Sequence, residues 1–525
     1  MSTGTGTPYR SSLRTGRDGF IHLLRAEWTK FRTVRGWVLA LGAAVLVTVL
    51  LGVLLAAGSH TSCSKGPVEA PCPPLPTGPG GEAVEDKFYF VYRPLTGDGS
   101  ITVRVTSMTG RIRLPDETPG VRNVVPGVVP WAKAGVIVKE SGEQGSPYAA
   151  VMVTGEHGVR MQHNFTHDTA GRPGKVSGKS PRWLRLTRAG ETLTGYESAD
   201  GVNWAVVGTV RLARLPDTVR IGMFAASPGD LTVTRGGLGG LSAAVRFAEV
   251  TAVFDRVGLG GGVPGGAWNR QDVGVTTGFD GSPHHPGGFV ESGGTFTVTG
   301  VGDVAPRADG SKIELPLTGT MTGLIVVIVV AVTSVTDEYR RGLIRTTLLA
   351  SPRRGRALAA KAAVIGAVAF AAGLAAAGIV VPLGVRILRA GGNDVLPVAA
   401  LTELRVIIGT AALFAATAVI SLAFGALFRR GVAAVVTAVT VVVLPHILAT
   451  TSVVPEGLSQ WLLRVTPAAG FAVQQSIPEY PQVIGHYAPA AGYYPLAPWA
   501  GAAVLCGYAV LALGLAVLLL RRRDA

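Results

Sequence analysis

Gly178, Lys179 and Ser180 form the stretch of this sequence that comes closest to a nucleotide-binding motif. A phosphate-binding loop needs a first glycine, four further residues and then Gly-Lys-Ser/Thr, because the backbone N–H groups of the loop surround the phosphates. The position of the first glycine holds Pro173, and Pro181 follows where a helix should begin. The chain is therefore predicted to carry no nucleotide-binding site of its own.

Acidic and histidine side chains could support hydrolysis or metal binding, but their spacing argues against both. A glycosidase on a β-sandwich needs acids close together on one strand. The acids between 83 and 257 are scattered instead over predicted turns and strand ends; they include Asp98, Asp116, Glu140 and Glu143. His284 and His285 are adjacent, so their side chains project differently, and no further ligand set lies near them. We predict no catalytic residue, no metal site and no cofactor bound by this chain.

Six long apolar stretches are the elements that must position everything else. A helix needs about 20 residues to cross ~30 Å of hydrocarbon, and an open sheet cannot span lipid because its edges leave polar groups unpaired. The predicted fold is therefore an α-helical polytopic membrane protein. Its six predicted transmembrane helices are 37–57, 317–336, 358–385, 403–427, 431–450 and 499–520.

Basic residues gather in every second segment between these stretches. Of the formal net charge of +15, residues 1–36 and 337–361 carry +5 each, whereas residues 58–316 carry only +1. The positive-inside rule then predicts a multi-pass plasma-membrane protein with both termini cytoplasmic and residues 58–316 extracytoplasmic. A pI near 10.1 could also indicate a nucleic-acid partner. Because the basic residues flank the spans, the predicted partner is the lipid bilayer and not nucleic acid.

The amino-terminal region divides into two segments before the first span. Residues 1–19 are rich in Ser, Thr, Gly and Arg, which predicts a disordered cytoplasmic arm. Residues 20–36 carry apolar side chains at helical spacing, which predicts an amphipathic helix along the inner interface. These apolar residues are Phe20, Leu24, Trp28 and Phe31. A plain anchor helix without further role is the alternative.

The region between the first two spans changes composition twice. Residues 58–82 form a Pro/Gly-rich linker holding Cys63 and Cys72, which an oxidising exterior permits to bridge. Residues 83–257 alternate apolar and polar side chains in short runs, which predicts an extracytoplasmic all-β sandwich inserted between helices 1 and 2. Residues 258–316 are Gly-rich. Whether they complete the sandwich or form a separate stalk is open at this stage.

Two basic motifs on the predicted cytoplasmic side resemble those of a known transporter class. LLRAEWTKFRTVRGW near the amino terminus and DEYRRGLIRTTLLASPRRGRALAAK at 337–361 resemble permease subunits of type-two ABC transporters, the export-class membrane subunits of bacteria. Residues 446–498, before the last span, are predicted to form short amphipathic helices at the outer leaflet. The six spans and this helical outer segment also match that class. The resemblance covers the membrane part, about half of the chain.

This resemblance implies a homo- or heterodimer of permease subunits, driven by a separate cytoplasmic ABC ATPase that binds the ATP. It also implies that the interface helix and the loop after the second span contact that ATPase. The ATPase-coupling residues it implies are Glu27, Trp28, Lys30, Glu338, Tyr339, Arg340, Arg341, Arg345, Arg353 and Arg354. Anchoring of these arginines to phosphates of the inner leaflet is the alternative.

A second resemblance concerns the predicted outer domain. WLRLTRAGETLTGYESADGVNWAVVG at 183–208 is similar to concanavalin-A-like lectin/glucanase sandwiches in its spacing of aromatic residues around Asp200-Gly201. Such sandwiches often bind sugars, which makes a glycan a candidate partner. The candidate ligand-binding residues are Trp131, Trp183, Tyr196 and Trp204. The alternative is that these aromatic residues are part of the core.

These features predict a permease subunit of an ATP-binding-cassette exporter rather than an enzyme. The predicted spans hold almost no charges, so an ion relay is disfavoured and a lipophilic or amphiphilic substrate is expected. A membrane-anchored glycan- or envelope-binding or sensor protein with a lectin-like outer domain is the alternative function. Glycosidase activity of the outer domain is not expected.

Overall fold

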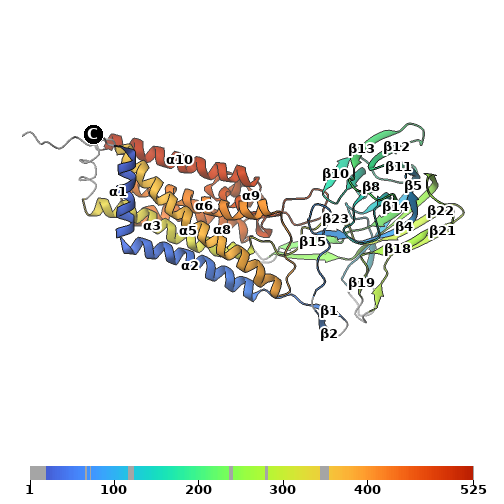
Figure 1. Ribbon diagram of the computed structural model, residues 1–525, viewed down its shortest axis with the longest axis horizontal. Helices are drawn as coiled ribbons and strands as arrows, with labels where there is room; N and C mark the ends of the chain where they lie inside the picture. The colour runs from blue at the N-terminus through green and yellow to red at the C-terminus, as the bar shows by residue number, and fades with distance from the viewer. Residues whose placement is uncertain are drawn as a thin grey trace, which may run out of the picture.

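The computed structural model describes residues 19–65, 68–70, 72–115, 123–235, 241–277, 282–342 and 354–523. The molecule is elongated, with a bundle of helices at one end and a β-rich domain at the other (Figure 1). The α-helices are α1 (Phe20–Thr33), α2 (Arg35–Gly58), α3 (Thr320–Arg340), α5 (Arg354–Ala390), α6 (Ala400–Phe428), α7 (Gly431–Ala438), α8 (Leu444–Thr450), α9 (Glu456–Val465) and α10 (Pro498–Arg523). The shorter helical turns are η2 (Leu315–Gly319), η3 (Val439–Val443), η4 (Pro467–Gln474) and η5 (Pro489–Ala491).

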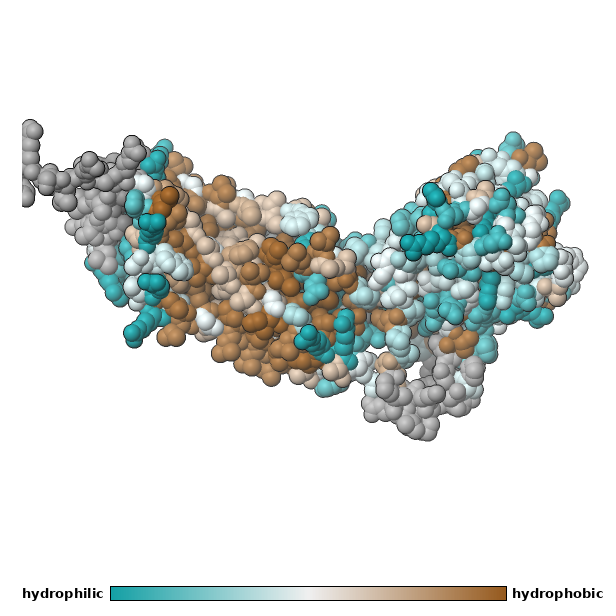
Figure 2. Space-filling model, in the orientation of Figure 1, coloured by the Kyte–Doolittle hydropathy of each residue, from teal (hydrophilic) through white to brown (hydrophobic). Residues whose placement is uncertain are grey.

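Six helical segments of the described chain are long and apolar enough to cross a membrane, which confirms the predicted number. They are Arg35–Gly58, Leu315–Arg340, Gly355–Ala390, Ala400–Phe428, Gly431–Thr450 and Pro498–Arg522. Figure 2 shows the band of apolar residues that these helices present, bordered by hydrophilic residues at both ends. An apolar band of this type is suited to contact with the hydrocarbon layer of a bilayer.

The fifth of these segments is interrupted by a π-helical turn, η3, between α7 and α8. Pro445 follows at the start of α8. A proline inside a helix has no N–H to donate and its ring clashes with the carbonyl four residues earlier, here that of Val441 in η3. The wider π turn removes this clash, so the apolar run continues across the proline.

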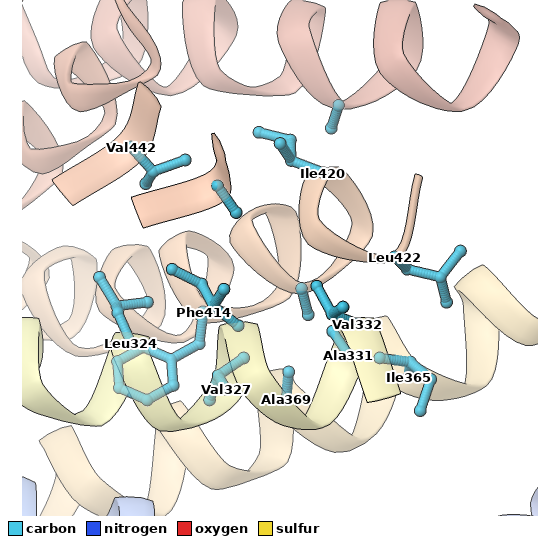
Figure 3. Close-up of a cluster of buried hydrophobic side chains, with 14 of the residues drawn as sticks. Leu324, Val327, Ala331, Val332, Ile365, Ala369, Phe414, Ile420, Leu422 and Val442 are labelled. Carbon is cyan, nitrogen blue, oxygen red and sulfur yellow. The ribbon is translucent and has the colours of Figure 1, made fainter. Parts of the chain in front are cut away.

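The centre of the bundle is built from small and branched side chains of α3, α5 and α6. Leu324, Phe414 and Ala369 come from these three helices and lie together in the buried cluster (Figure 3). Gly373 of α5 allows a close approach, because a Cβ added there would lie 2.9 Å from Ala411 Cα of α6. Small residues at such crossings allow membrane helices to pack backbone against backbone.

The β-rich region contains two large antiparallel sheets. One has seven strands in the order β10-β9-β8-β7-β14-β4-β18, and the other has the order β13-β12-β11-β5-β17-β22-β21, with β6 beside β5. The strands are β1 (Cys63–Lys65), β2 (Val68–Ala70), β3 (Val84–Asp86), β4 (Phe88–Thr96), β5 (Gly99–Arg113), β6 (Val124–Pro126), β7 (Lys133–Lys139), β8 (Tyr148–Thr154), β9 (Val159–His163), β10 (His167–Ala170), β11 (Arg182–Ala189), β12 (Thr192–Ser198), β13 (Ala205–Arg211), β14 (Thr218–Ala226), β15 (Asp230–Arg235), β16 (Leu241–Arg246), β17 (Ala248–Gly261), β18 (Asn269–Val273), β19 (Thr276–Thr277), β20 (Pro283–His284), β21 (Gly288–Ser292), β22 (Thr295–Gly300) and β23 (Val304–Pro306).

The two large sheets share one apolar core. Val136 and Val151 of the first sheet lie in the same buried cluster as Val103 and Leu186 of the second. Strands β5, β7, β8 and β11 supply alternate residues to this core, as the period of two in an extended chain requires. The described segment 63–306 is therefore a β-sandwich in architecture, and it follows α2 and precedes α3 in the chain.

The Gly-rich segment 258–316 adds strands to both sheets, which answers the question that its sequence left open. β18 pairs with β4 in one sheet, and β22 pairs with β17 in the other. The predicted division at residue 257 falls inside β17. Phe296 and Val298 of β22 are buried between exposed or partly exposed threonines, and this alternation is the signal for a strand in an otherwise Gly-rich sequence.

After the separate hairpin of β1 and β2, the strands that enter and leave the sandwich lie side by side. β3 pairs antiparallel with β23, so Asp86 lies opposite Val304. Two fully or almost fully buried lysines at the ends of β7 hold these strands: Lys139 pairs with Asp86 and Lys133 pairs with Asp303. A buried charge is tolerated only when it is paired and hydrogen-bonded. These two ion pairs therefore fix both connections to the sandwich.

Glu85, which precedes Asp86 in β3 and lies opposite Ala305 of β23, gives the domain a pH-dependent stability. Burial, and then the negative charge of Asp303, raise the pKa of the Glu85 carboxyl to about 7. The folded state therefore keeps the proton at pH values where the unfolded chain has lost it, so stability falls as pH rises from about 4.5 towards 7. We expect Glu85→Gln to raise the unfolding temperature at pH 8 by about 4 °C, and much less at pH 5.

Thermal unfolding of the detergent-solubilised full chain at the two pH values measures this effect. Glu291→Gln serves as the matched control because Glu291 is an exposed glutamate of β21. An equal effect of Glu85→Gln at pH 5 and pH 8 would contradict the titration of Glu85.

Candidate functional site

Helix α1 lies across one end of the bundle, at the end away from the β-rich domain (Figure 1). It ends at Thr33, and α2 begins two residues later at Arg35. Phe31 of α1 is buried among the apolar side chains of the bundle, whereas Trp28 remains 49% exposed. The predicted apolar face is therefore split: one part packs on the other helices and the other part remains free for a further contact.

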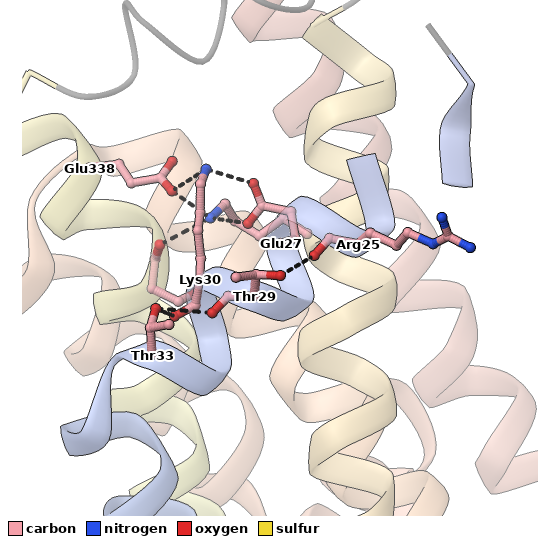
Figure 4. A network of polar contacts seen from close by, with 8 residues as sticks. Arg25, Glu27, Thr29, Lys30, Thr33 and Glu338 are labelled. Atoms are coloured by element: carbon pink, nitrogen blue, oxygen red, sulfur yellow. Dashed lines mark hydrogen bonds and ion pairs between the residues drawn. The ribbon is translucent and has the colours of Figure 1, made fainter. Parts of the chain in front are cut away.

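Four charged side chains join α1 to the bundle in one network. Lys361 Nζ of α5 lies 2.7 Å from Glu27 Oε2 of α1 and 2.8 Å from Glu338 Oε1 of α3. Lys30 Nζ of α1 lies 2.8 Å from Glu27 Oε1 and 3.2 Å from Glu338 Oε1. Glu27, Lys30 and Glu338 converge in Figure 4, while Arg25 points away from them. We call these four residues, Glu27, Lys30, Glu338 and Lys361, the charge network.

The charge network is neutral overall, because it holds two lysines and two glutamates. Each ammonium group contacts both carboxylates. Burial raises the pKa of the Glu27 carboxyl, but Lys361 and Lys30 outweigh it, so the pKa lies below its ordinary value. Burial lowers the pKa of the Lys30 ammonium, but Glu27 and Glu338 outweigh it, so that pKa lies above its ordinary value. The stabilisation is lost only as pH falls through the lowered pKa of Glu27 or rises through the raised pKa of Lys30.

Three of the ten candidate coupling residues, Glu27, Lys30 and Glu338, meet in the charge network. Sequence reasoning missed the fourth member, Lys361, because the third predicted span was treated as almost free of charge. The signal was present, since Lys361 lies inside the predicted span 358–385. An ionisable residue within a membrane span is expected to face a partner.

The remaining candidate coupling residues are not part of the charge network. Tyr339 lies near Arg429, the residue that follows α6: the Arg429 guanidinium carbon is 5.1 Å from the centre of the Tyr339 ring. Arg340 and Arg341 are exposed at the end of α3. Arg345 and Arg353 lie outside the described residues, and Arg354 is the first residue of α5.

Three of the four aromatic candidates lie on the outward face of the second sheet. Trp183 of β11 precedes the buried Leu184, and Tyr196 of β12 lies opposite Arg185. Trp204 comes directly before β13, with the Arg185 guanidinium carbon 3.9 Å from its ring centre. Trp131 lies elsewhere: it is buried and stacks on His157, with ring centroids 4.0 Å apart. The core interpretation therefore fits Trp131, and the three others are partly exposed.

Two arginine side chains also cover part of the Trp183 ring. Arg104 and Arg256 each place a guanidinium carbon 5.8 Å from the Trp183 ring centre. A ligand that stacks on the same faces of Trp183 or Trp204 would have to displace these cation–π contacts.

The two cysteines of the predicted linker, Cys63 and Cys72, form a disulfide, with their Cα atoms 4.9 Å apart.

Comparisons with known proteins agree with the helical part of this description. A family model described as "ABC-2 family transporter protein" matches residues 154–525, which is more than half of the chain. The chain therefore belongs to the ABC-2 transporter family and is a multi-pass membrane protein of that family. No curated protein matches the sequence.

Several solved structures show distant similarity to this chain. A functionally unknown protein from Saccharomyces cerevisiae is 13% identical, with a TM-score of 0.22, over 40% of this chain and 99% of that one. Scytalido-glutamic peptidase with a peptide-based transition-state analogue is 8% identical, with a TM-score of 0.23, over 41% of this chain and 98% of that one. The GH43 protein BlXynB from Bacillus licheniformis is 18% identical, with a TM-score of 0.16, over 28% and 26%.

Proposed function

We propose that this chain is the membrane-spanning permease subunit of an ATP-binding-cassette exporter, driven by a separate cytoplasmic ATPase. Membership of the ABC-2 family supports a transporter subunit. The single observation that carries the coupling mechanism is the charge network, which ties α1 to α3 and α5. A force on α1 then reaches two spans at once, because buried ion pairs resist separation.

The orientation that we propose places both termini and α1 in the cytoplasm and the β-rich domain outside, inserted between the first two spans. α1 and the carboxyl-terminal end of α10 lie at the same end of the bundle, opposite the β-rich domain (Figure 1). Basic residues gather at that end, including Arg340, Arg341 and the exposed Arg430. Such residues are retained on the cytoplasmic side of membranes.

The substrate class and the oligomeric state are further parts of this proposal. We propose a lipophilic or amphiphilic substrate, and a homo- or heterodimer of permease subunits. α2 and α7 expose large apolar side chains on their outer faces, among them Leu39 and Val432. These faces are suited to lipid or to a second permease subunit.

The exposed Trp28 on α1 offers the direct test of ATPase association. Large exposed aromatic residues often dominate a protein–protein contact. We expect Trp28→Ala to reduce recovery of the ATPase in a detergent pull-down by about thirtyfold, since a central interface tryptophan typically contributes about 2 kcal/mol or more. The unfolding temperature of the permease should remain unchanged, because this side chain is half exposed.

Trp461→Ala is the matched control, because Trp461 is 56% exposed at the opposite end of the bundle. Recovery of no ATPase with the native chain, under conditions that preserve a known complex, would count against the exporter. Equal recovery with Trp28→Ala and Trp461→Ala would remove α1 from the contact.

A second candidate function is recognition of glycan or envelope by the outer domain. The shared outward face of Trp183, Tyr196 and Trp204 favours it. Replacing residues 60–314 by a short linker separates the two functions. If transport is retained, the outer domain is accessory to transport. If glycan binding is lost while transport stays normal, the recognition role belongs to that domain.

A further inference from the structure

A cavity of about 730 Å³ opens at the end of the bundle next to the β-rich domain. It lies between the start of α6, helix α9, the segment 475–479 and the segment that leads into α10. Figure 1 shows α9 and the beginning of α10 at this end. The residues that matter for its chemistry are Arg405, Arg464, Glu479, Tyr487, Tyr494 and Trp499.

The side chains around the cavity place it at the depth of lipid headgroups. Trp499 is 70% exposed at the start of α10, and Trp461 is exposed on α9. Tryptophan gathers at the membrane–water interface because its ring is apolar and its N–H is polar. Leu401, beside the cavity on α6, is 80% exposed and suits contact with acyl chains. The cavity therefore meets both the aqueous phase and the edge of the hydrocarbon.

Arg405 brings an incompletely satisfied positive charge to this cavity. Its Nη2 donates to the backbone oxygen of Gln475 at 2.8 Å. Its Nη1 is buried, and no acceptor among the described residues reaches it. A buried donor without an acceptor is costly, more so on a charged group. The guanidinium is thus prepared for an additional oxygen acceptor.

The side chains that line the cavity carry two positive charges and one negative charge. Arg464 of α9 is exposed at the rim. Glu479 is the acid that lines the cavity. Glu314, which does not line the cavity, lies near enough to attract the charge of Arg405, and its Oε1 accepts the backbone N–H of Ser476 at 3.1 Å. Two guanidinium groups against one lining carboxylate favour an anion, and guanidinium binds phosphate and carboxylate oxygens in pairs.

The remaining wall combines the polar residues Thr402, Gln460, Gln475 and Ser476 with a larger aromatic and apolar part. Tyr487, Tyr494 and Trp499 line it together with prolines 478, 489, 495 and 498. Such a surface favours an apolar chain or ring over a small hydrated ion. The ligand that satisfies both parts of the cavity carries an oxyanion on an apolar body.

We infer that this cavity binds the oxyanion headgroup of an anionic amphiphile, with Arg405 and Arg464 contacting its phosphate, sulfate or carboxylate oxygens. The inference names the substrate class of the proposed exporter and rests on that function for the role of the ligand as cargo. Arg405 also connects α6 to the segment after η4. A ligand that contacts Arg405 therefore acts on the contact between α6 and this segment.

Native mass spectrometry of the purified full chain tests the binding. The probes are short-chain phosphatidylglycerol, short-chain phosphatidylcholine and inorganic phosphate. We expect phosphatidylglycerol to bind at least about tenfold more tightly than phosphatidylcholine, the size of effect of one charge-assisted hydrogen bond. Arg405→Gln and Arg464→Gln should each remove this preference. Arg389→Gln, at an exposed arginine of α5 outside the cavity, should keep it.

Arg464→Gln guards against misfolding, because Arg464 is exposed and its replacement leaves no buried gap. Equal preference for phosphatidylglycerol in the native chain and in both variants would overturn the inference. Competition by inorganic phosphate as strong as that by the lipid would overturn the amphiphile. Transport that continues when binding is lost would overturn the cargo role, whereas binding without any ATP-driven transport would overturn the exporter and leave the site.

Discussion

Replacing Lys361 by methionine is expected to abolish ATP-driven transport and to destabilise the helical bundle by about 3–5 kcal/mol, the usual cost of removing one partner from a buried ion pair. Lys361 is the member of the charge network that contacts both Glu27 and Glu338 from a third helix. Without it, two buried carboxylates share the single ammonium of Lys30, which is the more exposed lysine. α1 would then separate from α3 and α5.

Thermal unfolding of the purified chain and transport by the reconstituted complex measure the two consequences of Lys361→Met. Glu338→Gln combined with Lys361→Met should recover most of the unfolding temperature, because it leaves one carboxylate, that of Glu27, for the one remaining ammonium of Lys30. Transport should stay low in the double variant if the network couples α1 to the spans. Arg25→Met is the matched control, since Arg25 of α1 points away from the network (Figure 4). Normal transport in Lys361→Met would refute the coupling mechanism.

Lys139→Met is expected to unfold the β-rich domain at a much lower temperature than the native chain. Lys139 and Asp86 are fully buried, with Nζ and Oδ2 2.7 Å apart. Lys139 also donates to the backbone oxygen of Ser146, and Asp86 accepts the N–H of Gly145. Loss of the lysine leaves a buried carboxylate with one donor, at a cost of about 3–5 kcal/mol. Circular dichroism of the β-sheet signal during heating measures this loss.

A surface lysine of the same domain gives the comparison for Lys139→Met. Lys175 pairs with Glu156 at 3.1 Å, and both side chains are well exposed. Lys175→Met should change the unfolding temperature little, because water and salt screen exposed pairs. Asp86→Asn together with Lys139→Met should recover part of the stability. If Lys139→Met and Lys175→Met unfolded at the same temperature, the buried pair would not hold the entering strand.

The apolar runs and the alternation pattern were sufficient to predict the six spans and the β-rich region. Both depend on local chemistry: a span needs a minimum apolar length, and a strand on a core needs a period of two. The partner of each strand is not local. β5 pairs with β17, so Arg104 faces Asp255 across more than a hundred residues of chain. No periodicity within either strand specifies that pairing.

The candidate site was predictable where its residues lay in a recognised motif and not where they came from elsewhere. Glu27 and Glu338 lie in the two motifs that resembled ABC permeases, whereas Lys361 contributes through the packing of α5 against α1 and α3. The cavity next to the β-rich domain was not predicted, because it gathers Arg405, Arg464 and the segment before α10 from three separate parts of the chain. Only tertiary structure brings such groups together.

The pairing of β3 with β23 has a consequence for how this architecture could arise. The domain begins and ends on neighbouring strands, with Glu85 opposite Ala305. A module whose two ends are adjacent can be spliced into a tight loop without pushing the flanking helices apart. A simpler ancestor with a short connection at this point could thus have acquired the whole β-rich module in one genetic event, keeping its helical bundle intact.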